Sequence, residues 1–143
     1  MDALTSPYLI AIVVAWLLAH AIKYVIATSK GKQVDFTHQL FISGGMPSSH
    51  AATAVSVWMV TLLKDGSGSG LFGVVTLFTL IICYDAVKVR RSSGEQGAAI
   101  QSLIKEQKSK VILPRAAKGH TPVEVLVGAL LGILIGYVVV LAT

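Results

Sequence analysis

The sequence is poor in charged residues and in cysteine. Only 13% of its 143 residues are charged, whereas 54% are hydrophobic. A water-soluble domain of this length needs more charge to cover its surface, so the composition predicts a chain that folds in lipid. The single cysteine, Cys83, excludes a disulfide framework within the chain. It lies in an apolar run, where a small core residue is a better interpretation than a nucleophile.

The N-terminal segment has no basic residue before Lys23. A secretory signal peptide begins with a positively charged region, so the first apolar stretch is predicted to remain as a membrane span. Four stretches approach the roughly 20 helical residues that cross a bilayer, although the second is short. They are residues 8–27, 49–63, 71–89 and 122–142. The sequence therefore predicts an all-α integral membrane protein, a compact bundle of about four transmembrane helices in a single domain, residues 1–143.

Two of the connections between these spans contain apolar residues at spacings that suit short helices on a membrane surface. They are Phe36, Leu40 and Phe41 within residues 28–46, and Ile100, Leu103 and Ile104 within residues 88–119. We expect one interfacial segment in each connection.

Basic residues are distributed unevenly about the predicted spans. Eleven of the twelve Lys and Arg residues lie in the first and third connections or at the helix ends beside them, and Lys64 lies on the other side. Connections rich in Lys and Arg stay in the cytoplasm, so these two are predicted to be cytoplasmic and both termini to lie outside. A basic face at bilayer level suits anionic membrane lipids and is a poor site for nucleic acid.

This topology brings three polar clusters to one membrane face. They are residues 47–50 at the start of the second span, residues 85–91 at the end of the third, and His120 before the fourth. A helix N-terminus attracts anions through its unpaired N–H groups and its dipole, and two such ends meet several cations here. The face therefore predicts a site for a charged head group whose tail stays in the bilayer.

The strongest local signal is GGMPSSH at residues 44–50. An ordinary helix start explains the glycines, the proline in the first turn and the capping serines. It does not explain His50, and a histidine inside a span is uncommon and usually functional. We interpret His50 as a functional residue.

The second signal is GHTPVEVLVG at residues 119–128. Thr121 as the N-cap and Glu124 three residues later form a capping box, which accounts for Glu124 structurally. His120 is not accounted for, and Glu124 lies four residues beyond it, where its carboxylate could also orient the imidazole. Both roles of Glu124 stay open.

These two histidine clusters together resemble the superfamily of type 2 phosphatidic acid phosphatases and vanadium haloperoxidases. The chain resembles its divergent bacterial and plastid branch in particular. This resemblance rests on the segment GGMPSSH, the pattern Asp85-x-x-x-x-Arg90-Arg91 and the short length of the chain, and it covers residues 23–128. It implies a metal-independent phosphatase of isoprenoid or glycerolipid phosphates or diphosphates, which acts at the cytoplasmic face of a bacterial inner membrane or a plastid-type membrane. No cofactor is implied.

The resemblance also implies residue roles. His120 would be the nucleophile that accepts the phosphoryl group, Glu124 would hold it, and His50 would protonate the leaving oxygen. Ser48 would contact phosphate, and Ser49 would take the place of a family glycine. The cations implied in phosphate binding are Lys23, Lys30, Arg90, Arg91 and Arg115.

Two motifs depart from the family pattern. Lysine and glycine occupy positions 30 and 31, where the family has Arg-Pro. Arg115 lies five residues before His120, where the family has an arginine six residues before, so Arg90 and Arg91 are alternatives for that charge. These departures keep a second hypothesis open, a lipid-phosphate binding or transport protein that uses the same site without hydrolysis.

Some neighbouring residues have simpler interpretations. Asp85 is expected to pair with Lys88 or Arg90, and the alternative of a Mg²⁺ site with Glu95 rests on only two carboxylates. His20 either borders the site or makes a packed polar contact.

Three glycines recur at every fourth residue of the fourth span, namely Gly128, Gly132 and Gly136. Small residues at this spacing allow two helices to approach closely. Their partner is either another span of this chain or a second copy, so a homodimer through this face is one of two alternatives. A structural membrane subunit is the third and weakest functional hypothesis.

Overall fold

A computed structural model describes residues 6–31, 45–114, 116 and 119–143. These residues form helices and connections without any strand, which confirms the predicted all-α fold. The elements are α1 (Pro7–Ser29), α3 (Ser49–Asp65), α4 (Gly70–Tyr84), the π-helix η2 (Asp85–Val89), α5 (Arg90–Glu106) and α6 (Pro122–Ala142). The predicted interfacial segment around residues 36–41 lies outside the described residues.

Each predicted span lies on helical residues, the third on α4 and η2 together, and the chain is an integral membrane protein. Among the described residues, three helical stretches are long and apolar enough to cross a bilayer: Pro7–Ser29, Gly70–Glu106 and Pro122–Ala142. The helix α3 has 17 residues, or about 26 Å at the α-helical rise. It is therefore slightly shorter than a hydrocarbon core of about 30 Å.

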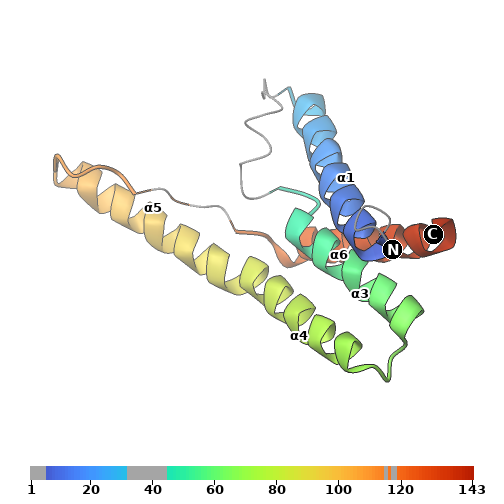
Figure 1. Ribbon diagram of the computed structural model, residues 1–143. Helices are drawn as coiled ribbons and strands as arrows, with labels where there is room; N and C mark the ends of the chain where they lie inside the picture. Colours follow the sequence, from blue (N-terminus) through green and yellow to red (C-terminus); the bar gives the residue numbers. More distant parts are fainter. Residues whose placement is uncertain (1–5, 32–44, 115, 117–118) are drawn as a thin grey trace.

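The short helix α3 lies at the centre of the bundle and packs against α1, α4 and α6 (Figure 1). Its contact with α1 is close because α1 places three alanines on that side, Ala11, Ala15 and Ala19, all fully buried. At this contact the Ser56 hydroxyl donates to the carbonyl oxygen of Ala11 at 3.2 Å. Larger residues of α6, Ile135 and Val139, complete the core around Ala11 and Ala15.

The glycine face of α6 is covered by α3. A Cβ atom at Gly132 would lie 2.5 Å from the carbonyl oxygen of Ala52, and one at Gly136 would lie 2.6 Å from that of Ser56. Gly128 meets the backbone of Ser48 in the same way. Of the two alternatives left open above, the structure contains the contact within the chain. A homodimer stays a prediction, and it would have to use another surface.

The third predicted span does not end at residue 89. The helix continues through η2 into α5 (Figure 1), so that Gly70–Glu106 is one helical stretch of 37 residues. The short helix predicted around Ile100 and Leu103 is part of α5. The helix continues because this stretch contains no proline and its second half includes strong helix formers such as Ala, Gln, Glu and Lys.

Candidate functional site

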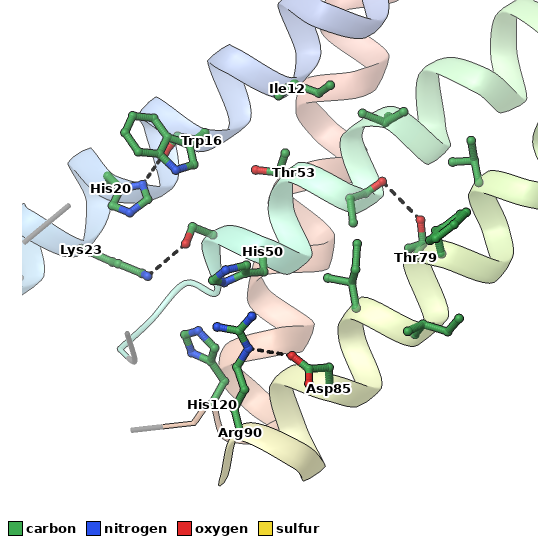
Figure 2. Close-up of a pocket in the computed structure, with 17 residues that line it drawn as sticks. Ile12, Trp16, His20, Lys23, His50, Thr53, Thr79, Asp85, Arg90 and His120 are labelled. Carbon is green, nitrogen blue, oxygen red and sulfur yellow. Dashed lines mark hydrogen bonds and ion pairs between the residues drawn. The ribbon is translucent and has the colours of Figure 1, made fainter. Parts of the chain in front are cut away.

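A cavity of about 860 Å³ opens between α1, α3 and the helix formed by α4 and η2 (Figure 2). One part of its lining is polar and consists of His20, Lys23, Ser49, His50, Asp85, Arg90 and His120. The rest is mainly apolar and includes Ile12, Trp16, Ala54, Val57, Val75, Phe78, Ile81 and Ile82. The cavity therefore offers a charged end and a hydrocarbon-like wall in one space.

His120 lies just before α6, and several backbone and side-chain contacts fix its position. Its backbone N–H donates to the carbonyl oxygen of Ala86 at 3.0 Å, which attaches this residue to η2. Its side chain is only 2% exposed, and Nδ1 lies 3.2 Å from Oε2 of Glu124. An ionised carboxylate only accepts hydrogen bonds. The proton therefore sits on Nδ1, and Nε2 keeps its lone pair.

Glu124 also serves as the capping residue that the sequence predicts. Its backbone N–H donates to Oγ1 of Thr121 at 3.3 Å, and its Oε2 accepts from the backbone N–H of Thr121 at 3.0 Å. The carboxylate is thus held by the start of α6 while it contacts His120. Both roles left open above occur in the same side chain.

The surroundings of His120 favour the neutral imidazole. Burial lowers the pKa of His120 below its usual 6.5, and the nearby Lys23 ammonium lowers this pKa further. The Glu124 carboxylate raises the pKa, but the net direction is downward. This shift leaves Nε2 unprotonated at neutral pH.

His50 meets His120 although seventy residues separate them in the sequence. It is the second residue of α3 and is exposed at the cavity. The two ring centroids lie 6.4 Å apart at an interplanar angle of 62°. Figure 2 shows both rings directed toward the same polar part of the cavity.

Two cations project toward these rings. Lys23, only 4% exposed, donates from Nζ to Oγ of Ser49 at 3.3 Å. Arg90 approaches from the opposite helix, and its Nε lies 2.6 Å from Oδ2 of Asp85. The pairing of Asp85 with a neighbouring cation, expected from the sequence, is therefore present with Arg90.

The π-helix explains why Asp85 and Arg90 share one side of the helix. Residues five apart lie about 140° apart around an α-helix. In η2 the backbone N–H of Arg90 instead donates to the carbonyl oxygen of Asp85, so the wider turn aligns the two side chains. Single π-turns occur frequently at functional sites.

The structure does not bring every candidate into the cavity lining. Ser48 is fully buried as the N-cap of α3, where its Oγ accepts from the backbone N–H of Ala51, so Ser49 is the serine that reaches the cavity. Lys30 is exposed just beyond α1. Arg91 is also exposed and pairs with Glu95 at 3.2 Å. Arg115 lies outside the described residues.

Sequence reasoning gave no role to Trp16, Thr53 and Thr79, all of which line the cavity. For Thr53 and Trp16, helical spacing in the sequence would have predicted a place beside the site. Thr53 lies four residues after Ser49, and Trp16 lies seven before Lys23, so each shares a helix face with a candidate. Thr79 lies on a helix whose apolar sequence carries no such signal.

The described residues contain no group of three or more His, Cys, Asp or Glu side chains placed to hold a metal ion. The acidic residue in the cavity lining, Asp85, is bonded to Arg90. The chemistry of the site rests on imidazole, ammonium and guanidinium groups.

Comparison with known proteins gives this arrangement a family context. Residues 4–135 match the model of a family described as the divergent PAP2 family. The chain is also 33% identical over 150 aligned positions to an uncharacterized membrane protein of Bacillus subtilis (strain 168), YuiD, and the match covers 94% of each protein. No solved structure matches the chain significantly.

Proposed function

The chain belongs to the divergent PAP2 family, and from this premise we propose that it is a membrane phosphatase of lipid phosphates with His120 as its nucleophile. One observation carries the proposal. The two imidazoles, 6.4 Å apart, meet Lys23 and Arg90 at the polar end of a cavity whose remaining wall is largely apolar. Such a cavity suits a phosphate attached to a hydrocarbon tail.

The first step transfers the phosphoryl group to the protein. The Lys23 ammonium and the Arg90 guanidinium neutralise the phosphate oxygens, since phosphoryl transfer depends mainly on positioning and charge stabilisation. Nε2 of His120 attacks phosphorus, and the bond from phosphorus to the lipid oxygen breaks. His50, in its protonated form, donates a proton to that oxygen, so the lipid leaves as an alcohol.

The second step restores the protein. A water molecule gives a proton to the now neutral His50 and attacks phosphorus, and the bond from phosphorus to Nε2 breaks. Phosphate leaves, and both histidines return to their starting states. Glu124 keeps the proton of His120 on Nδ1 and stabilises positive charge on the ring, as the carboxylate does in other base–orienter pairs.

The substrate approaches from the leaflet that faces the basic connections. Lys88, Lys105, Lys108 and Lys110 lie on the same side of the spans as the polar clusters. Under the positive-inside rule this is the cytoplasmic side, and both termini lie on the other. The lipid tail then follows the apolar wall while its phosphate reaches the two cations.

A second candidate function is binding or transport of lipid phosphates without hydrolysis. One observation favours it: among the described residues, only Lys23 and Arg90 bring cationic side chains to the cavity, and Arg90 is already bonded to Asp85. A site with this limited charge can hold a phosphate and yet stabilise a transition state poorly.

A trapping experiment separates the two functions. The purified protein is incubated with lipid phosphates labelled on phosphorus and quenched during turnover. The phosphatase predicts an acid-labile phosphoenzyme that is absent from His120→Gln but present in Lys64→Gln, a control that removes the cation on the other side of the predicted spans. Saturable binding of vanadate with neither phosphoenzyme nor phosphate release across the substrates would favour the second function.

A further inference from the structure

Two polar side chains in the cavity wall take no part in the chemistry proposed above. His20 of α1 and Thr53 of α3 both line the cavity, and Figure 2 draws them in the space between these two helices. His20 is only 4% exposed. The Thr53 hydroxyl is buried, and no other described residue offers it a hydrogen bond. A buried hydroxyl without a partner is costly, so a group that bonds it would stabilise this part of the bundle.

The unbonded state of Thr53 contrasts with that of other threonines in the same bundle. A threonine inside a helix can donate to the carbonyl oxygen four residues earlier. Thr61 and Thr76 do so at 2.8 and 2.7 Å. Thr79, which also lines the cavity, donates to the carbonyl oxygen of Ala54 at 3.4 Å. The hydroxyl of Thr53 therefore has no partner among the described residues, although its residue lines the cavity.

His20 presents a hydrogen-bond acceptor. Its Nδ1 lies 2.8 Å from the carbonyl oxygen of Trp16. A carbonyl oxygen only accepts, so Nδ1 carries the proton and Nε2 of the neutral ring holds a lone pair. The Trp16 indole packs against the imidazole with ring centroids 4.5 Å apart, which fixes the orientation of the ring. An acceptor and an unbonded hydroxyl therefore belong to two residues that line one cavity.

The two groups lie one helical turn deeper than the phosphate-binding end. The hydrogen bond from Lys23 to Ser49 marks that end. His20 precedes Lys23 by three residues on α1, and Thr53 follows Ser49 by four on α3, which corresponds to about 5 Å along each helix. This length is comparable with the reach from phosphorus to an oxygen on the second carbon of the esterified alcohol.

We propose that His20 and Thr53 form a hydroxyl-recognition subsite, which selects lipid phosphates with a free hydroxyl on the carbon next to the phosphate-bearing carbon. The hydroxyl donates to Nε2 of His20 and accepts from Oγ1 of Thr53, so both protein groups are satisfied. The inference rests on the proposed function, because it requires the phosphate beside Lys23. An isoprenoid phosphate lacks this hydroxyl, and the ionised second phosphate of a diphosphate has no proton to donate to His20.

The test compares two substrates that differ in this one hydroxyl. They are a 1-acylglycerol 3-phosphate and its counterpart without the 2-hydroxyl, presented to the purified protein in mixed micelles. We expect kcat/KM of the wild type to favour the hydroxyl substrate by about tenfold. Thr53→Val keeps the side-chain shape and should bring this ratio close to one, through a loss on the hydroxyl substrate alone. His20→Phe should do the same.

Thr79→Val is the matched control. It also removes a threonine hydroxyl from the cavity wall, but that hydroxyl is bonded to the backbone. The ratio between the two substrates should therefore stay at the wild-type value, whatever happens to the absolute rates. Thermal unfolding of each variant identifies any variant that has lost its fold.

The outcomes separate this inference from the proposed function. Turnover of both substrates at equal kcat/KM, or an unchanged ratio in a folded Thr53→Val protein, would overturn the subsite and leave the phosphatase standing. Turnover of neither substrate would overturn hydrolysis. Binding of the same two lipids is then measured, and the subsite still predicts a tenfold preference that Thr53→Val removes; equal binding or none would overturn the subsite too.

Discussion

The side chain of Glu124 links the stability of a helix end to the state of His120, the proposed nucleophile. Its carboxylate caps α6 and contacts Nδ1 of His120, so the same group fixes where the helix begins and which ring nitrogen faces the cavity. The pKa of His120 depends on this contact, on burial and on the Lys23 ammonium. A change at Glu124 therefore affects both rate and pH dependence.

The pH profile tests the state of His120. Its pKa is lowered from 6.5, so as the pH falls the imidazole stays neutral to a more acidic value than an ordinary histidine would. We expect the acid limb that His120 contributes to kcat/KM to fall below pH 6.5. An acid limb from this residue above that value would show that burial and Lys23 do not control it.

Replacement of Glu124 should move that limb further. Glu124→Gln removes the carboxylate that raises the pKa of His120, so the limb should shift to still lower pH. At the same time kcat should fall by roughly 10²–10⁴-fold, because the ring loses the group that orients it. Steady-state kinetics across pH measure both effects, and a shift toward higher pH would contradict the contact.

At the scale of the helices, the contact between α3 and α6 positions His50 and His120. His50 lies at the start of α3 and His120 just before α6, so the distance between them depends on how closely these helices pack. The glycines of α6 allow that approach, and Gly132 leaves no room for a Cβ atom beside Ala52.

Gly132→Ala should therefore destabilise the protein. We expect a loss of about 1–3 kcal/mol in the free energy of unfolding, the usual cost of overpacking, together with reduced activity. Gly73→Ala is the matched control, because a Cβ atom at Gly73 in α4 meets nothing within 4 Å. Thermal unfolding in detergent compares the two, and equal stability would mean that α3 and α6 separate easily.

The π-turn η2 is the second element that positions the site. Insertion of one alanine after Val87 should rotate the following residues by about 100° relative to Asp85, which takes Arg90 away from the imidazoles. We expect kcat/KM for a lipid phosphate to fall by at least about 10²-fold. Insertion of one alanine after Ser67, in the connection between α3 and α4, is the control. A folded protein with the insertion after Val87 that keeps full activity would show that the register of this turn does not position Arg90.

Sequence patterns predicted much of the molecule at the scale of single helices. The capping box at Thr121 fixed the start of α6, and the spacing of His120 and Glu124 predicted their contact. The serine that faces the cavity was not predictable, because Ser48 and Ser49 exchange roles when the helix start shifts by one residue. The alignment of Asp85 with Arg90 depends on a backbone hydrogen bond in η2, which leaves no mark in the residue types.

At the scale of the whole molecule, the distribution of Lys and Arg predicts which membrane face bears the site. A cysteine-free background with single cysteines at Ser67 and Ser109 tests this prediction through labelling of intact cells by an impermeant reagent. The positive-inside rule predicts that position 67 is labelled from outside and position 109 only after lysis. The reverse pattern would place the site on the outer face.

The helical stretch that leads to Arg90 packs against protein on one side and has exposed apolar residues on the other. It packs chiefly against α3, and Thr79 is the one buried residue of α4, while Val74, Leu77 and Leu80 are exposed and lie outside the cavity lining. In the membrane, acyl chains must press on that outer side. The lateral pressure and thickness of the bilayer therefore help to set the distance from the Arg90 guanidinium to the imidazoles of His50 and His120. The geometry of the site thus depends on the surrounding lipid.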